Sequence, residues 1–188
     1  MPNKVEFGIS NLHVGTYAVA ADNTVTLGTP YHQKGAVSFS PEEQSENNTF
    51  YADDIAYWSG YSGGTIEGDL EVALFDDAFK TQFLGYVTLT NGGIASVKNP
   101  TKPNVYIAFE VKGDAENRRV ILYNCSLGVI GREYATIEES KEPATETLGV
   151  TAVGDNATGV TKAVLKPGDS GYDTLFTAPS APVIQTTP

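Results

Sequence analysis

The sequence has little of what most catalytic and metal sites are built from. It contains one cysteine and two histidines, His13 and His32, in 188 residues. A single cysteine excludes an internal disulfide, and these three residues are too few for a structural zinc site. Cys125 ends a run typical of a strand, so we interpret it as a small core residue rather than a nucleophile. No histidine lies in a triad context, and no phosphate loop or dinucleotide fingerprint occurs. These absences give little support to Ser or Cys hydrolase chemistry, and we predict no cofactor and no metal.

Long apolar runs are also absent. No stretch is long enough to span a membrane as a helix. Residues 1–15 lack the apolar centre of a signal peptide, so we do not expect secretion by that route. At 40% hydrophobic and 19% charged residues, the composition is nevertheless that of a folded domain with a core.

Basic residues are missing between Lys34 and Lys80. Ten acids lie there: Glu42, Glu43, Glu46, Asp53, Asp54, Glu67, Asp69, Glu71, Asp76 and Asp77. The net charge of the whole chain is −11, so this stretch contributes −10 of it. Because DNA, RNA and anionic membranes are bound through lysine and arginine, the balance argues against ordinary binding to any of them. It is compatible with a surface that must repel nucleic acid.

Three of these acids alternate with small or apolar residues in the order Ile66, Glu67, Gly68, Asp69, Leu70, Glu71 and Val72. A period of two is typical of a half-buried strand, with one apolar face and one face that lines up the carboxylates. Like charges on one face cost stability, so such a strand calls for a functional reason.

The chain is rich in Thr, Val, Tyr, Phe and Gly, with frequent turn residues, which predicts a mainly β fold. We expect strands at Gly35–Ser40, Phe50–Tyr61 in one or two pieces, Gly64–Leu74, Gly85–Thr90, Val105–Val111, Arg118–Val129, Glu146–Val153 and, shorter, Val160–Leu165. One helix is expected, capped by Asp76 or Asp77 and ending at Gly85. Asn91-Gly92-Gly93 predicts a tight turn.

Both ends are expected to be arms around a domain at residues 29–153. Residues 1–28 begin with a strand-like piece, Lys4–Ile9, and then become polar. Residues 154–188 are rich in Gly, Thr, Ala and Pro and allow a short turn at Tyr172–Phe176. Such a tail can bury little by itself, so we expect a neighbouring subunit to hold it, and its deletion to weaken assembly more than folding.

Two other interpretations of the acids and aromatics remain open. A carboxylate pair could serve as the acid and base of a glycosidase, with Tyr51, Tyr57, Trp58 and Tyr61 stacking on sugars. Without hydrolysis, the same aromatics would suit a carbohydrate- or receptor-binding β module. Asp53-Asp54 and Asp76-Asp77 do not have the ligand spacing of a dedicated calcium loop.

An ordered series of short segments resembles a known family. The segments are Asn3–His13, Pro30 with Gly35–Ser40, Phe50–Asp53, Tyr61 with Gly68–Leu74, Asp77, Phe79, Leu84-Gly85, Phe109-Glu110, Gly113-Asp114, Arg118-Arg119, Leu122–Cys125 and Glu142–Leu148. No single segment is specific, but their order and spacing from Asn3 to Val153 resemble the major tail proteins that form the tail tube of long-tailed bacteriophages (siphophages).

The resemblance implies a structural virion protein, not an enzyme. It implies a β-sandwich or barrel with one flanking helix, assembled into hexameric rings whose inner sheets join around a lumen. A long loop after an early strand would contact the adjacent ring. Implied partners are further copies of the chain, a tape-measure protein and tail terminator and initiator proteins. Double-stranded DNA would pass without specific binding, no membrane would be involved, and assembly would occur in the host bacterial cytoplasm.

The resemblance and the charge pattern together give site residues. We place Glu67, Asp69 and Glu71 at the lumen, where acids would repel phosphate; an outward, solvated strand face is the alternative. We place the ring-stacking loop at about residues 41–52, with candidates Glu42, Glu43, Glu46, Asn47, Asn48, Phe50 and Tyr51. Arg118, Arg119 and Arg132 are candidate basic partners across the interface, since arginine favours interfaces; ordinary solvated charges are the alternative.

Overall fold

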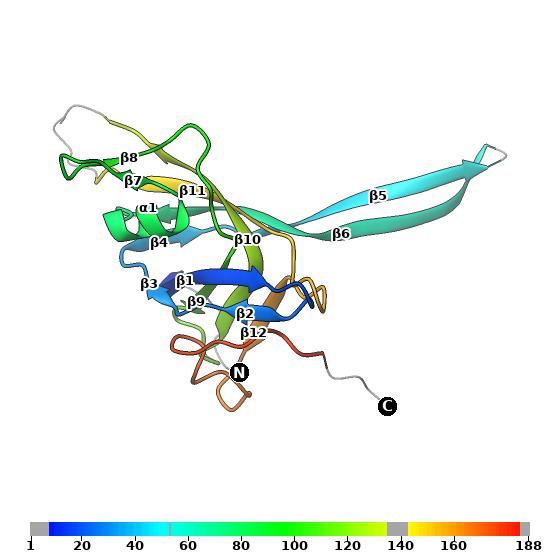
Figure 1. Ribbon diagram of the computed structural model, residues 1–188. Coiled ribbons are helices and arrows are strands. Elements are labelled where there is room, and N and C mark those ends of the chain that lie inside the picture. Colours follow the sequence, from blue (N-terminus) through cyan, green and yellow to red (C-terminus); the bar gives the residue numbers. More distant parts are fainter. Residues whose placement is uncertain (1–7, 53, 135–142, 185–188) are drawn as a thin grey trace.

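The computed structural model describes residues 8–52, 54–134 and 143–184, and these are mainly β with one short helix (Figure 1). The strands are β1 (Ile9–Val19), β2 (Val25–Leu27), β3 (Tyr31–His32), β4 (Ala36–Phe39), β5 (Glu42–Ala52), β6 (Ile55–Val72), β7 (Val87–Thr88), β8 (Ile94–Ala95), β9 (Val105–Val111), β10 (Arg119–Arg132), β11 (Glu146–Ala152) and β12 (Lys162–Leu165). The helix α1 spans Asp77–Phe83. The predicted fold class is confirmed. No described helix is long and apolar enough to cross a membrane.

Most strands belong to one antiparallel sheet, in the order β2-β1-β9-β10-β11-β6-β4. On the sides of this path, β3 pairs with β1, β12 with β10 and β5 with β6. The sheet curls on itself, because the ring of Phe39 on β4 meets the ring of Phe109 on β9 edge-on at 5.7 Å. The result is a sandwich-like body, and a separate pair, β7 with β8, lies beside it.

The main core lies on the concave face of this sheet. Leu70, Ile107, Leu122 and Leu148 from four neighbouring strands are fully buried there. The helix α1 and Phe75 just before it close this core with a row of rings: Phe75 stacks on Phe79 at 4.8 Å, and Phe79 meets Phe83 at a tilt, with centroids 5.1 Å apart. The burial of these apolar side chains is the main source of stability for the folded body.

The predicted helix is confirmed at both ends. Asp76 is the N-cap, and its carboxylate accepts a hydrogen bond from the backbone N–H of Phe79 at 2.8 Å. Gly85 follows the helix with φ +67°, a left-handed conformation that glycine adopts without strain.

A second cluster covers the opposite face of the central strands. Tyr17, Tyr106 and Ile121 lie there, and Leu175 from the C-terminal segment packs on them with 3% of its surface exposed. The described part of residues 154–188, up to residue 184, thus packs on its own subunit, and a neighbouring subunit that also holds it stays a prediction. Strands β9 and β10 carry apolar side chains on both faces, so the second face needs a cover, and the C-terminal segment provides it.

The N-terminal strand is longer and more central than the sequence indicated. β1 pairs with β9 and β2, and its Leu12 and Val14 are buried. The predicted piece Lys4–Ile9 lies mostly outside the described residues. Gly15 within β1 allows close packing, because a Cβ there would stand 2.4 Å from the hydroxyl oxygen of Tyr106.

A long hairpin, here called the arm, projects from the body (Figure 1). It consists of β5 and most of β6, paired from Glu42 opposite Glu67 to Ala52 opposite Ile55. The 11 residues of β5 correspond to about 35 Å of extended chain. The sequence predicted a loop at 41–52 and a separate strand at 50–61. The polar run in β5 shows no alternation, because the projecting arm has no core to face.

Candidate assembly surfaces

The acidic row, defined as Glu67, Asp69 and Glu71, occupies one face of β6. On the other face, Leu70 and Val72 are fully buried. Glu67 and Asp69 are exposed and Glu71 is half-buried. The predicted half-buried strand is confirmed, and all three carboxylates lie on the face that points away from the core.

The acidic row lies in a broad hollow of about 690 Å³ on the sheet surface. Strand β11 brings Thr147 opposite Glu71, Gly149 opposite Asp69 and Thr151 opposite Glu67. With Glu42, four carboxylates line the hollow, and the other lining residues are mostly Ser, Thr and Gly. Neither lysine nor arginine is among the described residues that line it. Small neighbours leave the carboxylates accessible, and none of the four takes part in an ion pair with a described residue. Lys102 reaches the lining only through hydrogen bonds to the carbonyls of Leu127 and Gly128.

Two hydroxyl groups hold the carboxylate of Glu71 in the acidic row. The hydroxyl of Ser38 donates to its carboxylate at 3.0 Å, and the hydroxyl of Thr145 donates at 2.6 Å. These two hydrogen bonds, first from Thr145 and then from Ser38, lower the pKa of Glu71 below its ordinary value. The charge of this carboxylate is therefore retained at neutral pH.

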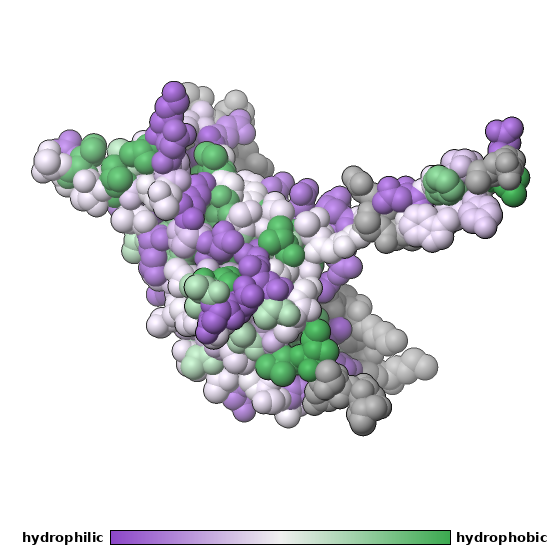
Figure 2. Space-filling model, turned by 45° about the vertical axis from the view of Figure 1, so that its right-hand side comes forward, coloured by the Kyte–Doolittle hydropathy of each residue, from purple (hydrophilic) through white to green (hydrophobic). Residues whose placement is uncertain are grey.

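The outer part of the arm is rich in exposed apolar side chains. They are Phe50, Tyr51, Ile55, Tyr57 and Trp58, each between 58% and 75% exposed. Phe50 lies directly opposite Trp58 in the strand register. Figure 2 shows the outer part of the arm standing clear of the body. Near its base the arm is held to the body, because Lys162 pairs with Glu43 at 2.9 Å and the Thr161 hydroxyl donates to the carbonyl of Gly64 at 2.8 Å.

The predicted stacking residues all fall on β5, in the arm. The nearer ones are Glu42 and Glu43 and the outer ones Asn47, Asn48, Phe50 and Tyr51; Glu46 is placed by its backbone alone. Sequence reasoning left Ile55, Tyr57 and Trp58 on the returning strand out of the stacking loop, and considered Tyr57 and Trp58 only as residues that could stack on sugars. The signal was present, since the pair Asp53-Asp54 between two aromatic runs is typical of a hairpin turn.

The three candidate arginines have partners within their own chain. Arg118 pairs with Asp114 at 2.7 Å and Arg119 with Glu110 at 3.0 Å. Arg132 pairs with the buried Glu146 at 3.3 Å. Their role as partners across a subunit interface stays a prediction, and it requires these pairs to be exchanged on assembly.

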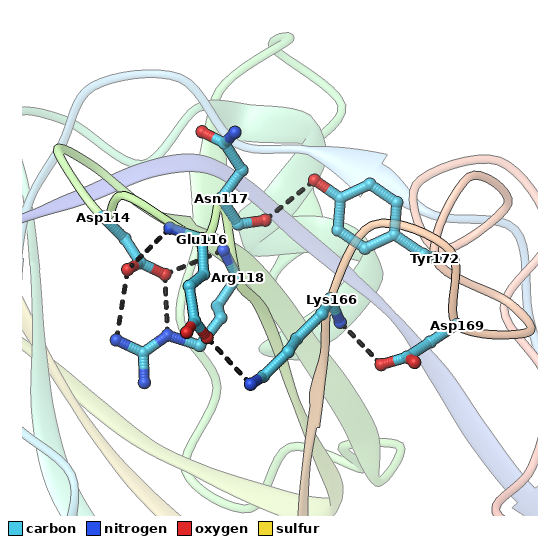
Figure 3. A network of polar contacts seen from close by, with 7 residues as sticks. All are labelled: Asp114, Glu116, Asn117, Arg118, Lys166, Asp169 and Tyr172. Atoms are coloured by element: carbon cyan, nitrogen blue, oxygen red, sulfur yellow. Dashed lines mark hydrogen bonds and ion pairs between the residues drawn. The ribbon is translucent and has the colours of Figure 1, made fainter. Parts of the chain in front are cut away.

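The C-terminal segment is fastened to the loop between β9 and β10 by polar contacts (Figure 3). Lys166 forms an ion pair with Glu116 at 2.8 Å, and the Tyr172 hydroxyl donates to the carbonyl of Asn117 at 2.8 Å. Arg119 adds a cation–π contact, 4.0 Å above the ring of Tyr172. The segment is thus part of the folded body in a single chain.

Solved structures of injection-system components resemble the chain in outline. The cap in "Cryo-EM structure of the anti-feeding prophage cap (AFP tube terminating cap)" is 10% identical with a TM-score of 0.49, over 86% of this chain and 93% of that one. A chain of the PVC sheath-tube complex of an extracellular contractile injection system is 11% identical with a TM-score of 0.44, over 87% of this chain and 95% of that one.

The family assignment comes from sequence. No curated protein matches the chain. The model of the family described as "Phage tail tube protein" matches residues 2–161, which is most of the chain. Members of such a family are structural parts of the virion rather than enzymes, and this chain belongs to the phage tail tube protein family.

Proposed function

We propose that this protein assembles into hexameric rings that stack into the tail tube, with the acidic row lining the lumen through which phage DNA leaves. The observation that carries the proposal is the arm. It presents five large apolar side chains to water on a hairpin that stands away from the body. Exposed apolar patches of this kind mark interfaces, and an isolated two-stranded hairpin is only marginally stable in water. A neighbouring subunit would cover the side chains and order the arm.

The sheet edges support lateral assembly. Strand β2 ends the strand order on one side and β4 on the other. An edge strand leaves backbone N–H and C=O groups unpaired, and such edges join readily to other chains. A closed ring in which each subunit presents one edge to the next would satisfy these groups without producing an open aggregate.

The charge of the hollow supports a lumen-facing position for the acidic row. A basic lining would bind the phosphates of DNA and slow its passage, whereas uncompensated carboxylates repel them. The hollow is lined by four carboxylates, those of the acidic row and of Glu42, and by no described lysine or arginine. The tape-measure protein would fill the lumen before ejection, and terminator and initiator proteins would close the ends of the tube.

Electron microscopy of the purified protein over a concentration series tests the assembly. Rings or tubes should appear as the concentration rises. Replacing Tyr57 and Trp58 together by serine should shift assembly to higher concentration by about tenfold or more, since each lost aromatic contact is worth on the order of 1 kcal/mol. Val183→Ser is the matched control, because Val183 is 88% exposed but lies in the C-terminal segment.

Two results would contradict the proposal. Wild-type particles that stay small at every concentration would argue against self-assembly as the function. Glycan binding by such particles, abolished by Trp58→Ser, would favour a receptor-binding module of the virion instead.

A further inference from the structure

A stretch without acids directly follows the stretch without bases. No Asp or Glu occurs at residues 78–109, where Lys80, Lys98 and Lys102 are the charged residues. This stretch carries most of α1, the strands β7 and β8, and the first residues of β9. The arm, by contrast, has five acids and no base at residues 41–65. Acidic residues are therefore concentrated at residues 41–65, and basic residues alone carry charge at residues 78–109.

These two pieces lie at opposite ends of the molecule. Strands β7 and β8 form a small hairpin on the side of the body away from the arm (Figure 1). Its turn is well defined: the backbone N–H of Leu89 donates to the carbonyl of Gly93 at 2.7 Å, and Gly92 has φ +85°. The lysines on the side of β7 and β8 are thus held apart from the acids of the arm, of which Glu43 pairs instead with Lys162 near the base of the arm at 2.9 Å.

The β7–β8 hairpin also carries exposed apolar residues. Val87, Leu89 and Val97 are each 40% to 45% exposed, and Lys98 beside them is exposed too. These four residues are called the β7–β8 patch. Figure 2 shows apolar side chains on this side of the molecule as well as on the arm. Strand β7 pairs with β8 over only two residues in each strand, so this unit, like the arm, has little to stabilise it alone.

Two of the three lysines at residues 78–109 have partners within the subunit. Lys80 forms an ion pair with Glu146 at 3.1 Å. Lys102 donates hydrogen bonds to the carbonyls of Leu127 and Gly128. Lys98 lies on the exposed patch, where an incoming acidic segment would meet it.

We infer that the arm of one subunit docks on the β7–β8 patch of another copy of this chain. The aromatic side chains of the arm would cover the aliphatic side chains of the patch, and its acids would face Lys98. Because the two surfaces differ and lie at opposite ends, the contact is heterologous and repeats head to tail, as stacked rings require. This inference rests on the proposed function and names the surface that the arm meets.

Cysteine cross-linking in assembled particles tests the contact. One preparation carries Tyr57→Cys on the arm and another carries Leu89→Cys on the patch. The native Cys125 is fully buried and does not interfere. After equal mixing, assembly and oxidation, we expect disulfide-linked dimers that are absent from either preparation alone. A chain that carries both substitutions should give a ladder of higher multimers. Val164→Cys, with the same 45% exposure as Leu89 but on β12, is the matched control for the patch and should give no dimers with Tyr57→Cys.

The outcomes separate this inference from the proposed function. If the wild-type protein forms tubes but Tyr57→Cys links to Val164→Cys, to itself or to nothing, the docking surface is wrong and the tube assignment stands. If the wild-type protein forms neither rings nor tubes, the proposed function fails and the docking contact fails with it.

Discussion

At the residue scale, the two histidines of the chain form a stack instead of lying in loops. The ring of His13 lies 4.7 Å from that of His32 on one side and 4.7 Å from that of Phe176 on the other. Arg119 lies over the far side of Phe176, 4.7 Å from its centroid. This column joins β1 and β3 to the C-terminal segment.

The stack predicts a dependence of stability on pH. Burial lowers the pKa of His13, and the nearby His32 lowers it further, against the opposing effects of the Asn11 carbonyl and of Glu110. Because the folded-state pKa lies below the unfolded value, the unfolded chain binds more protons in the window below pH 6.5, and stability falls as pH falls through it. We expect the melting temperature to drop between pH 7 and 5.

His13→Phe isolates the contribution of this residue, because phenylalanine keeps the ring stack but cannot be protonated. The variant should show a smaller drop in melting temperature over the same pH range. An identical drop in both proteins would show that other groups cause the effect.

At the scale of elements, Glu146 joins the helix to the sheet. With 4% of its side chain exposed, it pairs with Lys80 of α1 at 3.1 Å and with Arg132 at the end of β10. Its other oxygen accepts a hydrogen bond from the backbone N–H of Phe75 at 2.8 Å. One carboxylate thus satisfies groups from three segments around the Phe75–Phe83 row.

Glu146→Ala should be strongly destabilising, because it leaves Lys80 charged and nearly buried without a partner. We expect a loss of about 3 kcal/mol in the free energy of unfolding, measured by chemical denaturation. The control is Glu116→Ala, which breaks the exposed pair with Lys166 and should cost less than about 1 kcal/mol. Equal losses in the two variants would contradict this role for Glu146.

The C-terminal cover gives a second prediction for an element. Leu175→Ala should lower the stability of the isolated subunit by about 2–3 kcal/mol, because it opens a cavity against Tyr106 and Ile121.

Deletion of residues 154–188 should impair folding at least as much as assembly, which reverses the expectation from sequence. A truncated subunit with unchanged stability would mean that the cover forms only weakly in solution.

The elements that sequence reasoning predicted well have a local cause. Helix α1 follows from Asp76 and Gly85, and the acidic row follows from alternation in β6. The elements that it missed depend on distant contacts. The polar strand β5 is set by pairing with β6, and β1 is set by the packing of Gly15 under Tyr106. Secondary-structure propensity carries no information on either of these contacts.

The same distinction applies to the candidate sites. Charge counting found the acidic row and one strand of the arm. It could not show that Arg118, Arg119 and Arg132 already have partners in their own chain, because those pairs join residues that only the fold brings together. Nor could it show that the arm and the β7–β8 patch lie at opposite ends.

At the scale of the whole molecule, charge reversal of the acidic row should block DNA passage without blocking assembly. Replacing Glu67, Asp69 and Glu71 together by lysine changes the net charge from −11 by +6, to −5, and places cations where phosphates would pass. We expect phage that carry this triple variant to form tails but to lose infectivity. The triple glutamine variant, which removes charge without reversing it, should be affected less. Normal infectivity of the lysine variant would contradict a lumen-facing row.

The most direct measurement is a cryo-electron microscopy map of the assembled protein at a resolution that traces strands. We predict stacked rings of this chain around an open lumen, with β6 turned so that Glu67, Asp69 and Glu71 face the hole. A tube in which this strand face lies on the outer surface, or particles without a central hole, would contradict the account.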